Sequence, residues 1–316
     1  MNAIVLTVAP IFGLIALGYA LGRVGYLTEA AGKGLAEFVF SVAIPVLLFR
    51  MMVNAQPPPA SADPFALWGA YYSAVAIIWL MVALATRFLL GRPARDGASI
   101  AMAAAYGNVV MLGIPIALDR LGAEAATPIA LIVSLSSPVL WFSATLHMEL
   151  ALRKGDLAVL PLLRELVLSL LKNPIIAGML AGLVWRQTGL GLHPIPDKMI
   201  SMLGQAAIPG ALVALGLSLT GFKVSGQLWT VTVICVLSLV VLPVVAWVMA
   251  FHVFSLPPVW AGVAVIFAAC PPGANAFLFA TRYKAAVNSV SAAVALGTAL
   301  SILSVSLVLL MLHPGG

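Results

Sequence analysis

Long apolar runs follow one another along almost the whole chain, and they limit the possible folds more than any other feature. Charged residues make up 8% of the 316 residues, against roughly 25% in a soluble globular domain. A soluble fold of this size could not cover its surface, so lipid must be the solvent for most of the chain. A helix crosses a bilayer with roughly 20 apolar residues. We therefore predict an all-α membrane protein with ten transmembrane helices, at 3–22, 34–53, 65–90, 97–121, 126–149, 166–186, 198–220, 228–252, 258–281 and 286–312.

Several other classes of protein are not expected. The net charge of +6 fits the excess of Lys and Arg in the cytoplasmic loops of membrane proteins better than it fits nucleic-acid binding. Cys235 and Cys270 both lie in apolar runs, and the four histidines are scattered without metal-ligand spacing. The pattern predicts membrane lipid as a partner, with no cofactor, metal site or enzymatic constellation.

The distribution of Lys and Arg predicts the orientation. Of the 16 basic residues, twelve fall in the odd-numbered loops and four on the other side. Because cytoplasmic loops carry the excess, we expect the odd loops in the cytoplasm and both termini outside, on the periplasmic side of a cell inner membrane. The twelve are Arg23, Lys33, Arg87, Arg92, Arg95, Arg153, Lys154, Arg164, Lys172, Lys223, Arg282 and Lys284, and the four are Arg50, Arg120, Arg186 and Lys198.

The chain also repeats itself weakly. A shift of 164 residues carries Pro10 onto Pro174, Gly18 onto Gly182 and Ala43-Ile44-Pro45 onto Ala207-Ile208-Pro209. Prolines are costly inside helices, so their coincidence weighs more than that of small residues. The interpretation is a first repeat at 1–150 and a second at 151–316, each with five crossings. Because five is odd, the two repeats would lie in opposite orientations, as in many secondary transporters.

Two of the expected helices contain sequences that cannot continue as regular helix. The fourth contains Gly107-Asn108 and Pro115, and the ninth contains Pro271-Pro272-Gly273-Ala274-Asn275. Unwound backbone at bilayer depth is tolerated only where it is buried or lines a wet cavity, and matching interruptions in two inverted repeats point to a substrate site. The half-helices that begin there favour an anion. The alternative is a pair of ordinary proline kinks.

Four motifs together resemble the auxin efflux carrier family, which includes plant PIN-FORMED carriers and bacterial malonate and malate permeases. The resemblance covers essentially the whole chain, and the motif in the ninth helix is its most specific part. The motifs are Phe38-Val39-Phe40-Ser41-Val42-Ala43-Ile44-Pro45-Val46-Leu47-Leu48-Phe49, Gly107-Asn108-Val109-Val110-Met111-Leu112-Gly113-Ile114-Pro115, Asn173-Pro174 and Pro271-Pro272-Gly273-Ala274-Asn275-Ala276-Phe277.

The resemblance implies a scaffold domain and a transport domain that moves as an elevator, with helices 4 and 9 crossing at the substrate. It carries the crossover asparagines over to Asn108 and Asn275. The predicted site consists of these two residues with Gly107, Gly273, Ala274 and Arg50, and the predicted helix-break residues are Pro45, Pro115, Pro209, Pro271 and Pro272.

The sequence also departs from the plant carriers. Leu48 stands where they have a serine near the substrate, and the third helix is apolar from Phe65 to Thr86 where they have an Asp and a Lys. We therefore expect a small mono- or dicarboxylate such as malonate or malate rather than auxin.

Three points stay open at this stage. Arg50 either gives a bidentate contact to a carboxylate or extends outward from its helix end. The serines at 134, 136 and 137 either allow tight helix packing or contact a ligand. An anion channel or passive pore is the alternative function, and a homodimer is possible.

Overall fold

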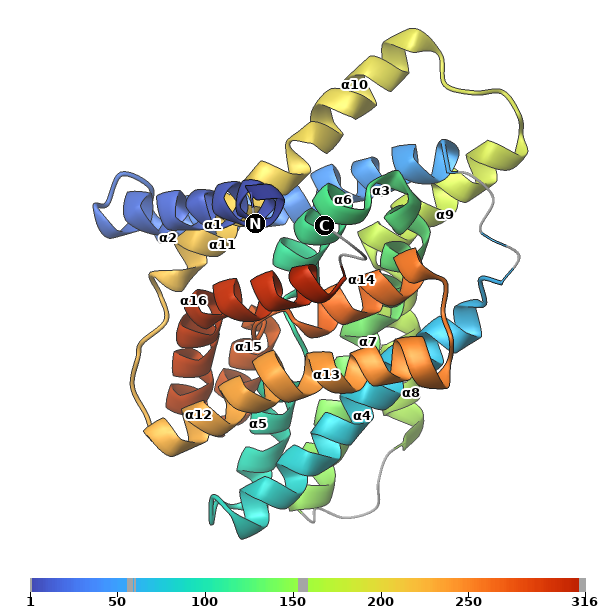
Figure 1. Ribbon diagram of the computed structural model, residues 1–316. Helices are drawn as coiled ribbons and strands as arrows, with labels where there is room; N and C mark the ends of the chain where they lie inside the picture. The colour runs from blue at the N-terminus through green and yellow to red at the C-terminus, as the bar shows by residue number, and fades with distance from the viewer. Residues whose placement is uncertain (1, 56–58, 60, 153–158, 313–316) are drawn as a thin grey trace.

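The computed structural model describes residues 2–55, 59, 61–152 and 159–312, and within these ranges it consists of helices and connecting turns, with one isolated β-bridge and no strand (Figure 1). The helices in chain order are α1 (Asn2–Arg23), α2 (Glu29–Phe38), α3 (Ile44–Val53), α4 (Pro64–Phe88), α5 (Ala94–Ala105), α6 (Ile114–Leu121), α7 (Ala126–Leu152), α8 (Val159–Leu171), α9 (Pro174–Gln187), α10 (Pro194–Gln205), α11 (Ala207–Leu219), α12 (Leu228–Val236), α13 (Leu242–Trp247), α14 (Pro258–Ala268), α15 (Ala274–Tyr283) and α16 (Val287–Met311).

Among the residues that the structure describes, seven helical runs are long and apolar enough to cross a membrane, so the prediction of an all-helical membrane protein is confirmed at that level. They are Leu6–Arg23, Glu29–Val53, Pro64–Phe88, Val109–Leu152, Pro194–Leu219, Leu228–Val253 and Val287–Met311. Several of the ten predicted crossings fall short because the chain interrupts them: α14, for example, has 11 residues and α15 has 10. The count of ten stays a prediction.

Three long runs contain a π-helical turn just before a proline. The turns are η1 (Val39–Ala43), η2 (Val109–Gly113) and η4 (Leu237–Val241), and the prolines are Pro45, Pro115 and Pro243. A proline ring clashes with the carbonyl four residues earlier in an α-helix. In the wider π-turn the Ile44 N–H bonds instead to the Val39 carbonyl, five residues back, and this spacing accommodates the ring.

This geometry corrects two of the predicted helix-break residues. Pro45 lies inside the continuous run Glu29–Val53, and Pro115 lies within α6, after the interruption rather than in it. Pro209 is the third residue of α11, just beyond the short interruption at Ala206.

The predicted sixth crossing, 166–186, is wrong as a single helix. Helix α8 ends at Leu171 and α9 begins at Pro174. The side-chain oxygen of Asn173 accepts a hydrogen bond from the Ile175 N–H at 2.9 Å. An Asn cap followed by proline is a strong start signal for a helix, and here it prevails over the apolar run.

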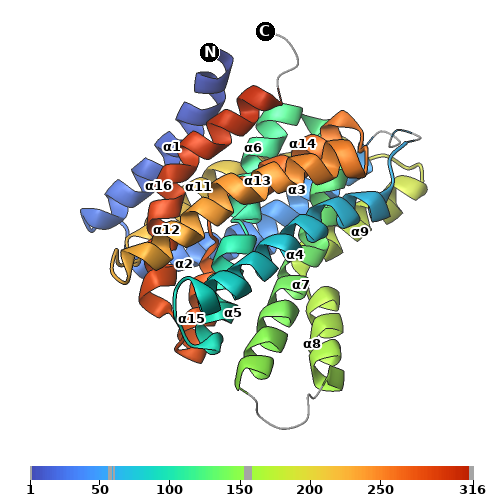
Figure 2. The ribbon, with the colours of Figure 1, turned by 60° about the horizontal axis from the view of Figure 1, so that its bottom comes forward.

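The helices form two groups that each draw on both halves of the chain (Figure 1). In one group α1 packs on α11, α3 packs on α9 and α10, and α2 packs on α11. In the other, α4 and α7 pack on α5, α13 packs on α14, and α12 packs on α16. Figure 2 shows α7 and α8 side by side at one end of this second group.

Glycines allow the closest approaches within the first group. A Cβ atom at Gly18 of α1 would collide with the Val213 carbonyl of α11, and one at Gly182 of α9 would collide with the Phe49 carbonyl of α3. Gly182 lies 164 residues after Gly18, and Val213 lies 164 residues after Phe49. The two contacts therefore have the same place in the two halves of the chain.

Candidate functional site

The first interruption lies between α5 and η2. Helix α5 ends at Ala105, Tyr106 is extended with φ −132° and ψ 109°, and Asn108 has φ −75° and ψ 63°. The Val109 N–H bonds to the Gly107 carbonyl at 2.8 Å, which closes an inverse γ-turn around Asn108. The chain leaves one helix and starts another within three residues.

The second interruption lies between α14 and α15, over residues 269–273. Pro271 and Pro272 fall in this stretch, as the sequence predicts. The Cys270 N–H bonds to the Phe267 carbonyl at 3.3 Å and closes the last turn of α14. Because neither proline has an N–H, the helix has no donor with which to continue.

The two interruptions bond to each other. The Asn108 N–H donates to the Pro271 carbonyl at 2.7 Å, and Gly107 and Pro272 form an isolated antiparallel bridge. A Cβ atom at Gly107 would lie 2.8 Å from both the Cβ and the carbonyl oxygen of Cys270. Only glycine permits this approach, so Gly107 is required by the contact between the breaks.

Each interruption ends at the start of a new half-helix, and the two starts differ. The Asn108 side-chain oxygen accepts from the Met111 N–H at 3.3 Å and caps η2. Gly273 stands at the N-cap of α15 and has no side chain to offer. The half-buried Asn275 side chain makes no hydrogen bond to any other residue that the structure describes. The sequence predicts a shared polar role for Asn108 and Asn275. The structure places Asn108 in the first interruption and Asn275 at the second residue of α15, and of the two side chains only that of Asn108 has a hydrogen-bond partner among the described residues.

Side chains of helices α4 and α7 pack beside the first interruption at Tyr106. The Tyr106 hydroxyl lies beside Ser136 and Ser137 of α7. The Tyr72 hydroxyl of α4 donates to the Ile132 carbonyl at 2.9 Å, and the Ser136 hydroxyl donates to the same carbonyl at 2.7 Å. The sequence analysis treated the third helix as apolar and therefore missed the contact of Tyr72 with the serines of α7.

Helix α16 supports the second interruption. The Ser304 hydroxyl donates to the Ala269 carbonyl at 3.2 Å. A Cβ atom at Gly297 would lie 2.8 Å from the Pro272 ring. Backbone and small residues therefore hold this break, whereas tyrosine and serine side chains hold the other.

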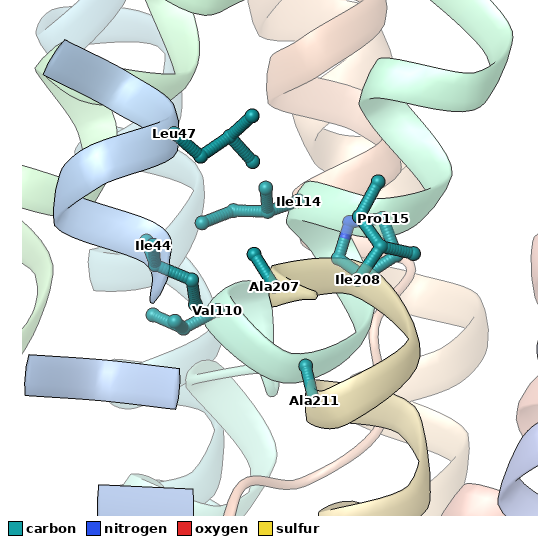
Figure 3. Close-up of a pocket in the computed structure, with 8 residues that line it drawn as sticks. All are labelled: Ile44, Leu47, Val110, Ile114, Pro115, Ala207, Ile208 and Ala211. Carbon is teal, nitrogen blue, oxygen red and sulfur yellow. The ribbon is translucent and has the colours of Figure 1, made fainter. Parts of the chain in front are cut away.

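An apolar contact closes the crossing on the side of the first helix group. Figure 3 shows side chains of α3, of η2 and α6, and of α11 converging there. They leave no room between them for a water molecule. The residues are Ile44, Leu47, Val110, Ile114, Pro115, Ala207, Ile208 and Ala211.

Arg50 has a protein partner. Its Nε donates to Asp197 Oδ1 at 2.7 Å and its Nη2 to Asp197 Oδ2 at 3.2 Å. This bidentate pair joins α3 to α10 and is about one-third exposed on each side. Sequence reasoning missed Asp197 because the two residues are 147 positions apart.

The chemistry on offer at the crossing is binding rather than catalysis. Residues 104–115 and 268–277 contain no charged side chain and no histidine. Among the described residues no group of His, Cys, Asp and Glu is placed to hold a metal ion. Amide groups, hydroxyls and the first N–H groups of two half-helices are the polar groups present, and these suit an anion of modest charge.

Comparison with known proteins gives two matches. A family model described as "Membrane transport protein" matches residues 3–309. A protein of Rhizobium meliloti (strain 1021), named "Putative malonate transporter", is 28% identical over 315 residues. That alignment covers 98% of this chain and 95% of the relative.

Proposed function

This chain belongs to the membrane transport protein family, which is the auxin efflux carrier family and a family of transporters rather than enzymes, and we propose that it is a secondary carrier for a small organic anion. The proposed substrate is a mono- or dicarboxylate, with malonate and malate as the first candidates because of the name of the R. meliloti relative. The proposed binding site is the crossing of the two interrupted segments.

The hydrogen bond from Asn108 to Pro271 is the observation that carries this proposal, because it brings two helix starts together. A helix start carries roughly half a positive charge. Two of them can offset most of the charge of one carboxylate without a basic side chain. The side-chain amides of Asn108 and Asn275 and the backbone at Gly107, Gly273 and Ala274 would supply the hydrogen-bond donors. Arg50 enters this site only in a state in which it leaves Asp197.

The proposed architecture is ten crossings in two inverted repeats, 1–150 and 151–316. The element bounds support it: α4 and α12 begin at Pro64 and Leu228, and α5 and α14 begin at Ala94 and Pro258, an offset of 164 residues in each case. The paired contacts of Gly18 and Gly182 support it independently. Contacts between the two halves also come in corresponding pairs, as two repeats related by a two-fold axis require. Helix α5 of the first half packs on α15 of the second, and the corresponding helix α14 packs on α6.

The proposed mechanism is an elevator. Helices α1 to α3 and α9 to α11 would form the scaffold, and the group that holds the crossing would move against it. The wholly apolar contact of Figure 3 supports this division, since an interface without hydrogen bonds or ion pairs has none to break when the two sides slide.

The proposed orientation has both termini on the periplasmic side of a cell inner membrane. This orientation rests on the distribution of the 16 Lys and Arg residues along the sequence. Two of them, Arg153 and Lys154, lie outside the described residues. Reporter fusions after Arg92, Lys154 and Arg282 should each report the cytoplasm. A periplasmic signal at two of the three sites contradicts this orientation.

Counterflow in proteoliposomes tests the carrier function. Unlabelled malonate or malate inside the vesicles should accelerate uptake of the labelled compound, because a carrier returns faster when it is loaded. Uptake without this stimulation indicates an anion channel or passive pore. If no short carboxylate is taken up at all, the proposed substrate class is wrong. Mass measurement of the purified complex tests the homodimer.

A further inference from the structure

A long apolar groove runs between the segment α12–α13 and helix α16. Its volume is about 690 Å³. Of its 15 lining residues, only Cys235, Trp247 and Ser304 carry a side-chain N–H, O–H or S–H group.

Neither water nor empty space suits this groove. The Ser304 hydroxyl already donates to the Ala269 carbonyl, and a bound water needs two to four polar partners. The groove is open along one side rather than enclosed, so in a membrane the surrounding lipid borders it directly. The occupant must therefore be apolar.

The groove opens sideways at the depth of the membrane. Its walls belong to Leu228–Val253 and Val287–Met311, two of the runs that are able to cross a bilayer. Val244 is 53% exposed and Leu303 is 70% exposed. Hydrocarbon from the surrounding bilayer therefore reaches the groove directly.

The dimensions fit an acyl chain better than a helix. At 1.5 Å per residue, Val236 to Val248 covers about 18 Å and Leu300 to Met311 about 16 Å, close to the roughly 15 Å of one leaflet. A volume of about 690 Å³ over that length leaves a cross-section of about 40 Å², roughly half that of a helix about 10 Å across.

The matching place in the first half of the chain is filled by aromatic side chains. There the Trp68 Nε1 donates to the Leu131 carbonyl at 2.9 Å, and the Trp79 Nε1 donates to His147 Nδ1 at 3.2 Å. Together with Tyr72, these rings close α4 onto α7. The offset of 164 residues places Thr232, Val236 and Pro243 where α4 has Trp68, Tyr72 and Trp79. The groove is therefore present where the second half lacks three rings.

We propose that this groove binds an acyl chain of a membrane phospholipid, lying along α12–α13 and α16. The chain would pack against Val265 of α14 and beside Ser304, which holds the Ala269 carbonyl at the second interruption. The lipid would thus brace α12–α13 against α16, the helix that supports this break. The inference needs only that the chain spans a membrane, so it stands independently of the proposed substrate.

A matched pair of variants tests it. Val244→Trp places an indole in the groove. Leu80→Trp introduces the same side chain at the matching position of α4, where Leu80 is 60% exposed. Detergent-purified proteins are stripped of lipid, incubated with vesicles of palmitoyl-oleoyl phosphatidylcholine, and examined by native mass spectrometry and thermal melting.

The parent and Leu80→Trp should each retain the phospholipid and melt higher with it. Val244→Trp should retain at least about tenfold less phospholipid than the parent, because the indole displaces several buried CH₂ groups of the acyl chain. The melting temperature of this variant should not rise when lipid is added. The proposal is overturned if the parent retains none, or if both variants retain the same amount. A dimer that only Val244→Trp dissociates would show instead that a second copy covers the groove.

Discussion

The two interruptions cross at one point, yet they are built from different chemistry. At the first, the chain turns around Asn108, whose own side chain caps the next half-helix, and Tyr72, Tyr106 and Ser136 gather behind it. At the second, two prolines stop the helix, and the Asn275 amide has no partner among the described residues. The comparison teaches that asparagines at two crossing breaks need not have the same role in the fold: the Asn108 side chain caps a helix, and the Asn275 side chain makes no hydrogen bond to any described residue.

The largest effect should come from filling the space between the two breaks. In Gly107→Ala the new Cβ would meet the Cys270 carbonyl oxygen at 2.8 Å and the Phe267 carbonyl oxygen at 3.0 Å. Backbone atoms cannot rotate away, so we expect a loss of about 3 kcal/mol, the upper end of the overpacking range. The measurement is thermal and denaturant unfolding in detergent.

Gly273→Ala is the matched control on the other break. Its Cβ would find its nearest neighbour at 3.6 Å, an ordinary contact, and its φ of −84° suits any residue. Stability should be unchanged or slightly higher, since alanine reduces the entropy of the unfolded chain. Equal melting of the two variants would mean that the close approach at Gly107 does not hold the breaks together.

Removing the Asn275 side-chain amide should lower the affinity for the substrate and leave the stability of the fold unchanged. In Asn275→Ala we expect the affinity for the transported carboxylate to fall by roughly tenfold to a hundredfold, because a hydrogen bond to a charged group is worth about 1.5–3 kcal/mol. The substrate-free melting temperature should match the parent, since the side chain bonds to no described residue. Parental affinity with a lowered melting temperature would reverse the roles assigned to Asn275.

Removing the capping amide should affect both quantities. Asn108→Ala loses the oxygen that accepts from the Met111 N–H, and we expect about 0.5–2 kcal/mol of lost stability. Asn108→Ser keeps a capping oxygen but no NH₂ donor, so it should recover stability and still bind substrate weakly. If the serine variant binds like the parent, Asn108 only caps the helix and does not touch the anion.

The smallest effect concerns a property that the two breaks share. Neither contains an Asp or Glu, so the crossing lacks the carboxylate oxygens that hard cations prefer. We expect uptake to continue at the same rate when choline replaces sodium. A fall of more than about tenfold, equivalent to 1.4 kcal/mol of coupling, would show that neutral oxygens at the breaks bind sodium.

Local chemistry made the places of the two breaks predictable. Gly107-Asn108 and Pro271-Pro272-Gly273 are sequences that no regular helix accepts, and both interruptions fall there. The family was also recognisable from these motifs, and the match over residues 3–309 confirms it. The bounds 166–186 began the sixth crossing too early because the apolar run continues through this region, whereas the Asn173-Pro174 motif marks the true start of α9.

Partners that are distant in the chain were not predictable in the same way. The Asn108–Pro271 hydrogen bond and the Arg50–Asp197 ion pair each join residues more than 140 positions apart. No local propensity indicates such a pair. The search for membrane helices also counts tyrosine and tryptophan as apolar. The hydrogen bonds by which Trp68 and Tyr72 join α4 to α7 could therefore not be predicted from the sequence.

The π-turns have a consequence for how these helices choose their neighbours. Each residue of an α-helix advances the side-chain direction by about 100°, and a π-turn contains one residue more than an α-turn. The turn at Val39–Ala43 therefore resets the rotational phase of the run between α2 and α3. Helix α2 packs on α11, whereas α3 packs on α9 and α10, so one crossing presents its apolar stripe to two different sets of helices. Deleting a single residue from this turn would let the Ile44 N–H bond to the Val39 carbonyl in a regular α-turn, so α3 would keep its face toward α9. The Pro45 ring would then meet the carbonyl four residues before it, and the run would kink there.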